Sequence, residues 1–254
     1  MFGPDPAGAV QPLSSGGAPG DTLSVDTFAA LGCSEPFLGA LERRGFQSPT
    51  PVQAESFQPG LEGRDLLVQS ETGSGKTLAF GLPLMHRLSE EKRPQAIVLT
   101  PTRELAQQVG EELQSVMPRL EIALLVGGLG YAPQLKALKY GARVVVGTPG
   151  RVQDHLDRGS LDLSGITMVV LDECDEMLNM GFLEDVEKIL SGVPAGQQTF
   201  LFSATLPAPI ASRPSASSPI RTASTTARSP ARPSTPTSST PRAWSPITCT
   251  PRRW

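Results

Sequence analysis

The 254-residue sequence lacks any long hydrophobic run, and its apolar stretches, such as residues 96–99 and 168–171, are short. A membrane-spanning helix needs about 20 predominantly apolar residues, so the sequence predicts no transmembrane segment. Cysteine is also scarce, because Cys33, Cys174 and Cys249 are far apart and match no metal-ligand spacing. This usage is typical of a reducing compartment and excludes a dense disulfide framework.

Each end of the sequence lacks charge of one sign. Residues 1–42 contain no Lys or Arg, whereas a secretory signal has a basic start and a mitochondrial presequence is rich in Arg. We therefore expect an intracellular protein, cytoplasmic or nuclear. No Asp or Glu follows Glu187, and residues 207–254 hold seven Arg and no Lys. The rest of the chain has 15 basic and 25 acidic residues. The overall charge of −3 is therefore the sum of a basic tail and an acidic remainder of the chain.

Two segments have compositions that cannot bury a core. Residues 1–22 are rich in Gly, Pro and Ala, and residues 208–254 are rich in Pro, Ser, Thr and Arg. Such segments gain too little from burial to offset their chain entropy, so we expect a disordered leader and a disordered tail. Residues 23–207 remain as the predicted folded domain.

Within that domain, short β-rich runs alternate with stretches of helical periodicity, which is typical of an α/β fold with a mainly parallel sheet. The predicted strands are residues 66–69, 96–100, 122–126, 143–147, 168–172 and 199–203. The predicted helices are residues 76–89, 103–116, 131–139, 151–157 and 182–190. Ligands of such sheets bind beyond the carboxyl ends of the strands, so the residues that follow each strand are the candidate functional residues.

A glycine-rich motif, SETGSGKT, occupies residues 70–77 between the first predicted strand and a helix. Its glycines let backbone N–H groups surround phosphate oxygens, and the helix N-terminus adds a favourable dipole. Lys76 is placed to reach the β and γ phosphates of a nucleotide, and Thr77 to ligate magnesium. Because Ser70 takes the first glycine position of the strict pattern, a Gly/Ser-rich turn that caps a helix is the alternative interpretation.

An acidic motif, DECD, occupies residues 172–175 at the end of another predicted strand. There Asp172 could hold magnesium through water, and Glu173 could orient or deprotonate an attacking water. Acidic residues also favour helix starts, so a solvated helix start is the alternative interpretation. Together the two motifs predict an ATPase site with Lys76, Asp172 and Glu173 as its catalytic residues.

Five further motifs accompany these two in chain order: GFQSPTPVQ (45–53), PTRELAQ (101–107), the pair Gly127 and Gly128, TPGR (148–151) and SAT (203–205). With these motifs the chain resembles the DEAD-box RNA helicases of superfamily 2. The resemblance implies a single RecA-like domain of the P-loop NTPase type, ATP and Mg²⁺ as cofactors, and a monomer. Cys174 stands where most of the family has alanine, and its small side chain should fit the same space.

The resemblance also implies roles around the nucleotide. Gln53 would recognise the adenine edge, since a side-chain amide can pair with both N6 and N7 of adenine, and the aromatic residues Phe28 and Phe46 would pack near the base. Without the resemblance, Gln53 would be interpreted as an exposed residue of a helix opened by a PTP turn. The remaining implied nucleotide-binding residues are Ser70, Glu71, Thr72, Gly73, Ser74, Gly75, Lys76 and Thr77. Thr77 and, through water, Asp172 would be the magnesium ligands.

Three of the motifs follow predicted strands and in the family contact the RNA backbone. The implied RNA-binding residues are Pro101, Thr102, Arg103, Gly127, Gly128, Thr148, Pro149, Gly150 and Arg151. Hydroxyl, N–H and guanidinium donors to phosphate oxygens do not read base identity, so sequence-independent RNA binding is implied. Alternatively, the two arginines cap helices or pair with nearby carboxylates. The SAT residues Ser203, Ala204 and Thr205 would couple the nucleotide state to strand separation, partly by hydrogen bonds to the acidic motif.

The family joins two RecA-like domains, and no motif of the second domain occurs in this sequence. Arginines of that domain stabilise the transferring phosphate, and an arginine finger is commonly worth about 10³ to 10⁵ in rate. We therefore expect an ATP-dependent RNA helicase represented here by a truncated ATP-binding half, with slow hydrolysis and little unwinding alone. A non-catalytic ATP- and RNA-binding module or a pseudogene product is the alternative. A DNA helicase of the same superfamily is disfavoured by the motif around Gln53 and by PTREL.

The tail after Pro207 has two interpretations. Its Pro, Arg, Ser, Thr and Ala content is typical of GC-rich codons read out of frame, which favours a frameshifted or misassembled gene. The competing hypothesis is a natural RNA-binding tail, whose arginines would hold phosphates in a salt-dependent way.

Overall fold

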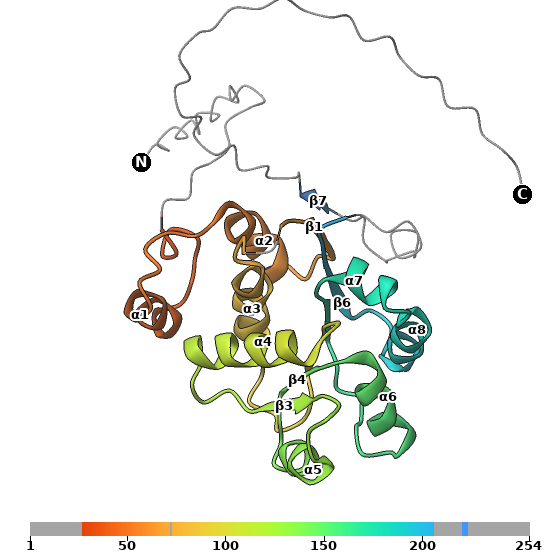
Figure 1. Cartoon of the computed structure of the whole chain (residues 1–254). Coiled ribbons are helices and arrows are strands. Elements are labelled where there is room, and N and C mark those ends of the chain that lie inside the picture. Colours follow the sequence, from red (N-terminus) through yellow and green to blue (C-terminus); the bar gives the residue numbers. More distant parts are fainter. Residues whose placement is uncertain (1–26, 72, 206–219, 223–254) are drawn as a thin grey trace, which may run out of the picture.

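A seven-stranded sheet with helices on both faces forms the centre of the computed structural model, which describes residues 27–71, 73–205 and 220–222 (Figure 1). The strands are β1 (Leu66–Gln69), β2 (Ala96–Leu99), β3 (Ile122–Leu125), β4 (Val144–Gly147), β5 (Met168–Leu171), β6 (Gln198–Ser203) and β7 (Ile220–Thr222). The helices are α1 (Glu35–Arg43), α2 (Pro51–Leu61), α3 (Lys76–Arg87), α4 (Arg103–Val116), α5 (Tyr131–Lys139), α6 (Pro149–Asp157), α7 (Cys174–Asn179) and α8 (Leu183–Gly192).

The strand order is β3-β4-β2-β5-β6-β1-β7, and every neighbouring pair is parallel. In register, Leu99 at the end of β2 lies opposite Gly147 on one side and Leu171 on the other. The carboxyl ends of the central strands therefore finish level with one another. This brings the loops that follow β2, β4 and β5 to a single edge of the sheet.

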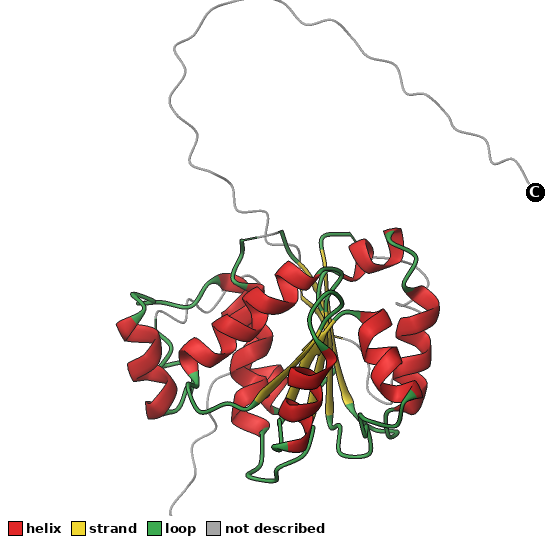
Figure 2. Ribbon diagram, turned by 60° about the horizontal axis from the view of Figure 1, so that its bottom comes forward, coloured by secondary structure: helices red, strands yellow, loops and turns green. Residues whose placement is uncertain are grey.

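The two faces of the sheet bury separate hydrophobic clusters, because successive side chains of a strand point to opposite faces. Val98 belongs to the cluster under α1 to α4, whereas its neighbour Ile97 belongs to the cluster under α5 to α8. Figure 2 shows the helices distributed on either side of the strands. Strands β2, β4 and β5 are buried along their whole length, as expected for a parallel sheet covered on both faces.

The predicted α/β class and all six predicted strands are confirmed, with boundaries that differ by at most one residue. The predicted helices and strands do not include α1, α2, α7 or β7. Strand β7 falls within the segment expected to be a disordered tail and pairs with β1, which would otherwise expose an open edge. Strand addition at such an edge uses backbone groups, so it needs no alternating apolar pattern. Most of the predicted leader and tail lies outside the described residues.

Within the described ranges, no helix is long and apolar enough to cross a lipid bilayer.

Candidate nucleotide and RNA site

The glycine-rich loop leads from β1 into α3, and no side chain caps the first turn of that helix. Gly73 and Gly75 have φ angles of 83° and 90°, a left-handed conformation that glycine adopts without steric cost. The loop starts where the Ser70 N–H donates to the carbonyl of Ser203, at 3.1 Å. Lys76 follows Gly75 as the first residue of α3. Thr72, a predicted loop residue, lies outside the described residues.

Lys76 and Asp172 come together although they are far apart in the sequence. Asp172 follows β5, is 2% exposed, and its N–H donates to the carbonyl of Leu99 at 2.9 Å. Burial raises the pKa of Asp172 to about 6, while the nearby ammonium of Lys76 opposes that shift and the Glu173 carboxylate adds to it. Lys76 is itself only 8% exposed. A buried carboxylate with incomplete charge compensation is suited to hold a cation.

Several buried side-chain oxygens around the loop have no hydrogen-bond partner. They are Thr50 Oγ1, Ser70 Oγ, Ser74 Oγ and Asp172 Oδ1. Buried polar atoms are normally paired, so a group of unpaired ones points to a ligand that supplies the missing partners. The residues present therefore fit a phosphate-bearing ligand with a divalent cation.

Thr77, the predicted magnesium ligand on α3, is partly buried beside Lys76. In the described part of the chain, no three His, Cys, Asp or Glu side chains gather into a metal site. Beside nucleotides, Mg²⁺ usually takes most of its ligands from phosphate and water.

Gln53 connects the start of α2 to the glycine-rich loop. Its Oε1 accepts from the Thr50 N–H at 2.9 Å, and its Nε2 donates to the carbonyl of Gly75 at 3.1 Å. The side chain is 3% exposed, so the alternative that it lies exposed on a helix is wrong. A Cβ atom on Gly75 would collide with this amide. The Gln53 side chain therefore contacts the phosphate loop directly at Gly75, a contact that the sequence alone does not reveal.

The two predicted aromatic contacts differ in how much surface they retain. Phe28 is 3% exposed and packs within the core under α1 to α4, so its ring has almost no free face to offer a base. Phe46 is only partly buried, and the guanidinium carbon of Arg44 lies 5.5 Å from its ring centre. Of the two rings, Phe46 is the better placed to contact a bound ligand.

The two middle residues of the acidic motif are Glu173, whose backbone is strained, and Cys174, whose thiol is unreactive. Glu173 has a φ of 52°, the only positive φ among the non-glycine residues described, and it precedes α7. Such a conformation costs roughly 1–3 kcal/mol and is concentrated at functional sites. Cys174 is buried, and burial raises its pKa to about 12. Its thiol stays protonated at neutral pH, which fits a packing role rather than a nucleophilic one.

The SAT motif is bonded directly to the acidic motif. The N–H and the hydroxyl of Thr205 donate to Asp175 Oδ2 at 2.9 and 3.0 Å, and the Asp175 N–H donates to Ser203 Oγ at 3.3 Å. Burial raises the pKa of Asp175, but the hydrogen bonds from Thr205 and Ser203 outweigh it and the pKa is lowered. The carbonyl of Ala204 accepts from Gln69 of β1 at 3.0 Å. The motif thus joins the ends of β1 and β6 to the start of α7.

The predicted RNA-binding residues gather at the carboxyl ends of β2, β3 and β4. Thr102 caps α4, since its Oγ1 accepts from the Leu105 N–H at 3.2 Å. The guanidinium of Arg103 lies against Gly128, whose φ is 77° and where a Cβ would collide with it. The Thr148 N–H donates to the carbonyl of Leu125 at 3.1 Å, which holds the TPGR turn beside the end of β3.

Each arginine of these motifs makes one long ion pair, which is exposed at Arg103 and partly buried at Arg151. Arg103 lies 3.5 Å from Glu104, and Arg151 lies 3.7 Å from Asp154. The alternative that both pair with local carboxylates is therefore partly correct, but such pairs contribute little. Both guanidinium groups remain able to bind a phosphate. The sequence does not single out the two buried polar residues beneath these loops, Gln134 and His155, because burial is invisible before the fold is known.

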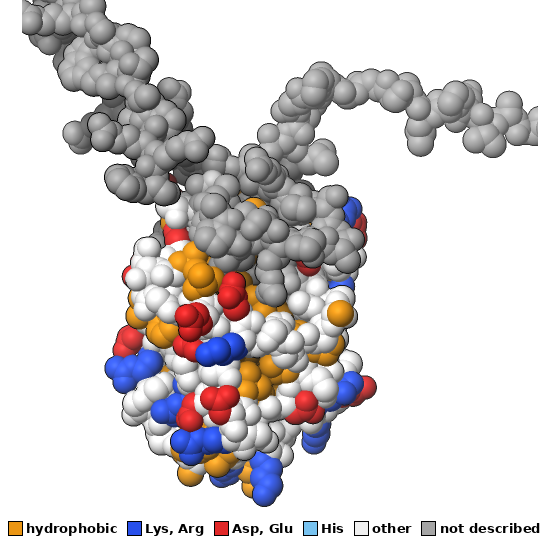
Figure 3. Space-filling view, turned by 90° about the vertical axis from the view of Figure 1, so that its right-hand side faces the viewer, with side chains coloured by type: hydrophobic (Ala, Val, Ile, Leu, Met, Phe, Trp, Pro, Cys, Tyr) orange, Lys and Arg blue, Asp and Glu red, His pale blue; other side chains and the backbone are white. Residues whose placement is uncertain are grey.

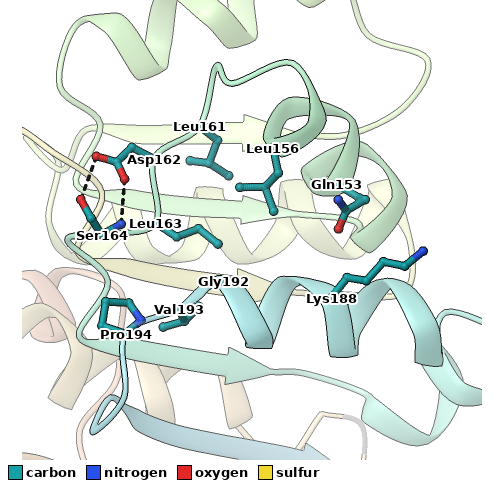
Figure 4. Close-up of a pocket in the computed structure, with 10 residues that line it drawn as sticks. All are labelled: Gln153, Leu156, Leu161, Asp162, Leu163, Ser164, Lys188, Gly192, Val193 and Pro194. Carbon is teal, nitrogen blue, oxygen red and sulfur yellow. Dashed lines mark hydrogen bonds between the residues drawn. The ribbon is translucent and has the colours of Figure 1, made fainter.

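The face that carries α7 and α8 has a mixed character, with basic and acidic side chains interspersed (Figure 3). An open cavity of about 530 Å³ lies between α6 and α8, near the amino ends of β5 and β6. Leu156, Leu161 and Leu163 line it, with Gln153 and Lys188 at one end (Figure 4). None of the predicted site residues lines this cavity, so it is separate from the nucleotide and RNA motifs.

A parallel α/β domain whose glycine-rich loop opens a helix beside a buried strand-end aspartate is a P-loop nucleotide-binding domain. Residues 50–212 match the family model described as DEAD/DEAH box helicase, and the chain belongs to that family. It is 54% identical over 185 residues to the ATP-dependent RNA helicase DeaD of Klebsiella pneumoniae, a match that covers 71% of this chain and 29% of that protein. It is 50% identical over 189 residues to the DEAD-box ATP-dependent RNA helicase CshA of Bacillus cereus, covering 73% of this chain and 36% of that protein.

A solved structure supports the same assignment. The crystal structure of a DEAD box protein from the hyperthermophile Methanococcus jannaschii superposes with a TM-score of 0.70 at 45% identity. The match covers 73% of this chain and 52% of that one. The chain thus spans about a third of the length of the two curated relatives described above.

Proposed function

We propose that this chain binds ATP with Mg²⁺ and the backbone of RNA, and that it is the ATP-binding half of an ATP-dependent RNA helicase. The observation that carries the proposal is that Lys76 lies near the buried carboxyl group of Asp172, beside a loop with buried side-chain oxygens that have no hydrogen-bond partner. The names of the relatives, which are ATP-dependent RNA helicases, support the choice of ATP and RNA. An intracellular location is part of the proposal.

Each group of the site has a distinct task in this proposal. Lys76 and the N–H groups of the loop bind the phosphates and orient them along the axis of α3. Thr77 and Asp172 would hold Mg²⁺, which neutralises charge on the phosphates when it is bound. Glu173, held by its strained backbone beside Asp172, orients an attacking water and accepts its proton. Gln53 links adenine recognition to the loop through its bond to Gly75.

RNA would bind across the loops that follow β2, β3 and β4. Arg103, Arg151 and the loop N–H groups are donors for phosphate oxygens, so we expect binding that is independent of base sequence. The hydrogen bonds from Thr205 to Asp175 would couple the acidic motif, which faces the nucleotide, to the SAT motif. Hydrolysis by the described domain alone should be slow, because arginines supplied from a facing domain typically contribute about 10³ to 10⁵ in rate.

Binding measurements on the whole chain test the proposal. A fluorescent ATP analogue is titrated with and without Mg²⁺, and two unrelated single-stranded RNAs and a DNA of matching sequence are titrated by fluorescence anisotropy. We expect Mg²⁺-dependent nucleotide binding that Lys76→Ala abolishes, and similar affinities for the two RNAs that Arg151→Ala weakens. Equal nucleotide binding by wild type and the Lys76 variant would refute the nucleotide site. Preference for the DNA would point to a DNA helicase instead.

A second candidate function is a non-catalytic module that binds ATP and RNA without turnover. Single-turnover hydrolysis with excess protein separates the two candidates. Slow, RNA-stimulated hydrolysis that Glu173→Gln removes supports the helicase half, whereas binding without any hydrolysis supports the module.

A further inference from the structure

A buried polar cluster lies beneath the two loops that carry Gly127, Gly128 and Arg151. Gln134 of α5 is 4% exposed and His155 of α6 is fully buried, and neither belongs to the nucleotide or RNA motifs. Polar side chains are placed in a core at a cost, which complete hydrogen bonding must offset. Their partners therefore show what they hold in place.

The side-chain amide of Gln134 donates hydrogen bonds to carbonyl groups in and beside the glycine loop. Its Nε2 lies 3.1 Å from the carbonyl of Val126, 3.3 Å from that of Leu129 and 3.1 Å from that of Gly130. Val126 precedes the loop of residues 127–130, Leu129 and Gly130 belong to it, and the loop contains three glycines. Glycine-rich backbone has the most conformational freedom to lose, so a loop of this kind needs such an anchor to keep one shape.

His155 fixes the orientation of that amide. Because Nε2 of Gln134 faces carbonyls, its Oε1 must accept a hydrogen bond, and His155 Nε2 lies 3.2 Å from it. Burial, aided by Arg151 and Arg158 against the opposing effect of Asp154, lowers the pKa of His155. The neutral ring then carries its proton on Nε2, and its Nδ1 lies 2.9 Å from the Ser160 hydroxyl oxygen.

The same histidine ties the glycine loop to the TPGR turn. His155 belongs to α6, the helix that begins with Pro149, Gly150 and Arg151. Its ring stacks on Tyr131, the first residue of α5, with centroids 4.2 Å apart and planes 8° from parallel. The guanidinium of Arg151 lies 5.8 Å from the Tyr131 ring, and its Nη1 donates to the Leu129 carbonyl at 3.4 Å. The glycine loop is thus bonded to Gln134, and the TPGR turn is joined to the same buried pair through α6.

We propose that Gln134 and His155 are positioning residues that hold the loops 127–130 and 148–151 in one arrangement for binding an RNA backbone. The inference rests on the proposed function, because it assumes that these loops contact RNA. Phosphate contacts require several donors at fixed separations, and a loop that is already ordered loses less entropy when it binds. Removal of the brace should weaken RNA binding and leave the nucleotide site, on the other side of β2, unaffected.

The test compares Gln134→Met and His155→Phe, which keep bulk and, for the second, the stacking on Tyr131. The matched control is Gln153→Met, since Gln153 also lies on α6 but faces the separate cavity near Lys188 (Figure 4). Anisotropy with a labelled single-stranded RNA gives the affinity for RNA, a fluorescent ATP analogue gives the affinity for nucleotide, and thermal melting reports the fold. We expect roughly ten-fold weaker RNA binding, or about 1.4 kcal/mol, for the two brace variants alone.

Two further measurements keep a folding defect apart from a positioning defect. His155→Gln places an amide nitrogen near the position of Nε2 and should recover most of the lost RNA affinity. Amide hydrogen exchange should become faster at residues 126–131 in the brace variants and stay unchanged around the phosphate loop. Equal losses of nucleotide affinity, RNA affinity and melting temperature would overturn the inference, because they indicate general destabilisation.

Arg151→Ala separates the inference from the proposed function on which it rests. If this variant weakens RNA binding while Gln134→Met and His155→Phe do not, the brace is refuted and the RNA site stands. If wild type and Arg151→Ala show no difference in RNA binding, the proposed RNA function fails and the inference fails with it.

Discussion

Replacing Asp172 by asparagine should stabilise the domain at neutral pH, although it removes a residue of the proposed site. Burial raises the pKa of Asp172 from 3.8 to about 6. Between these two pH values the folded state binds more protons than the unfolded state, so stability falls as pH rises towards 7. A shift of about two units corresponds to about 3 kcal/mol, which the wild type lacks at pH 7 and above.

The asparagine variant carries no such penalty. For a domain of this size, about 3 kcal/mol raises the melting temperature by roughly 6–12 °C. The assay is thermal and urea unfolding from pH 4 to pH 8, in the absence of nucleotide and Mg²⁺. Wild type should lose stability between pH 4 and pH 7 relative to the Asp172→Asn variant, and the difference should vanish at low pH.

Asp175, three residues further along, provides a control of opposite sign. Its pKa is lowered because hydrogen bonds from Thr205 and Ser203 outweigh its burial. Its contribution is therefore present at neutral pH and is lost as pH falls through its folded pKa. Asp175→Asn should destabilise the domain at pH 7. If Asp172→Asn is neutral or destabilising, or if the two variants shift stability in the same direction, the electrostatic reasoning is wrong.

Three further predictions concern other parts of the molecule. Gly75→Ala should reduce nucleotide affinity at least ten-fold and lower the free energy of unfolding by about 1–3 kcal/mol. The φ of 90° at Gly75 and the nearby Gln53 amide both exclude a Cβ atom. Isothermal titration with nucleotide and urea unfolding measure the two effects. Gln53→Ala should cost about 1–2 kcal/mol of stability, since the Thr50 N–H and the Gly75 carbonyl lose a partner, and it should reduce the preference for ATP over GTP in competition binding. Arg151→Ala should lower the slope of log affinity against log salt for RNA by about one, as expected for one lost phosphate contact.

The sequence predicts the sheet well because the strands β2, β4 and β5 are buried along their whole length and carry a strong local signal. Runs such as residues 96–99 and 168–171 are continuous and apolar, which is what a parallel strand covered on both faces requires. The proximity of Lys76 to Asp172 is likewise foreseeable, because both follow parallel strands and must lie at the same edge. Strand β7 is not foreseeable from pattern, since its pairing with β1 depends on backbone groups at an open edge.

Other features depend on contacts between distant residues and are invisible in the sequence. Nothing near Gln53 indicates that its amide binds the carbonyl of Gly75, 22 residues away. The left-handed backbone of Glu173 and the burial of Phe28 also follow from packing around the motifs rather than from the motifs. His155 and Gln134 are separated by 21 residues, and only the fold makes them neighbours.

The most decisive measurement is isothermal titration of Mg²⁺·ADP into the whole chain and into its Lys76→Ala and Asp172→Asn variants. Binding at one site by the wild type is expected, with loss of affinity in the Lys76 variant and loss of the Mg²⁺ dependence in the Asp172 variant. Identical binding by all three proteins, or none by the wild type, would contradict a nucleotide site built from these two residues.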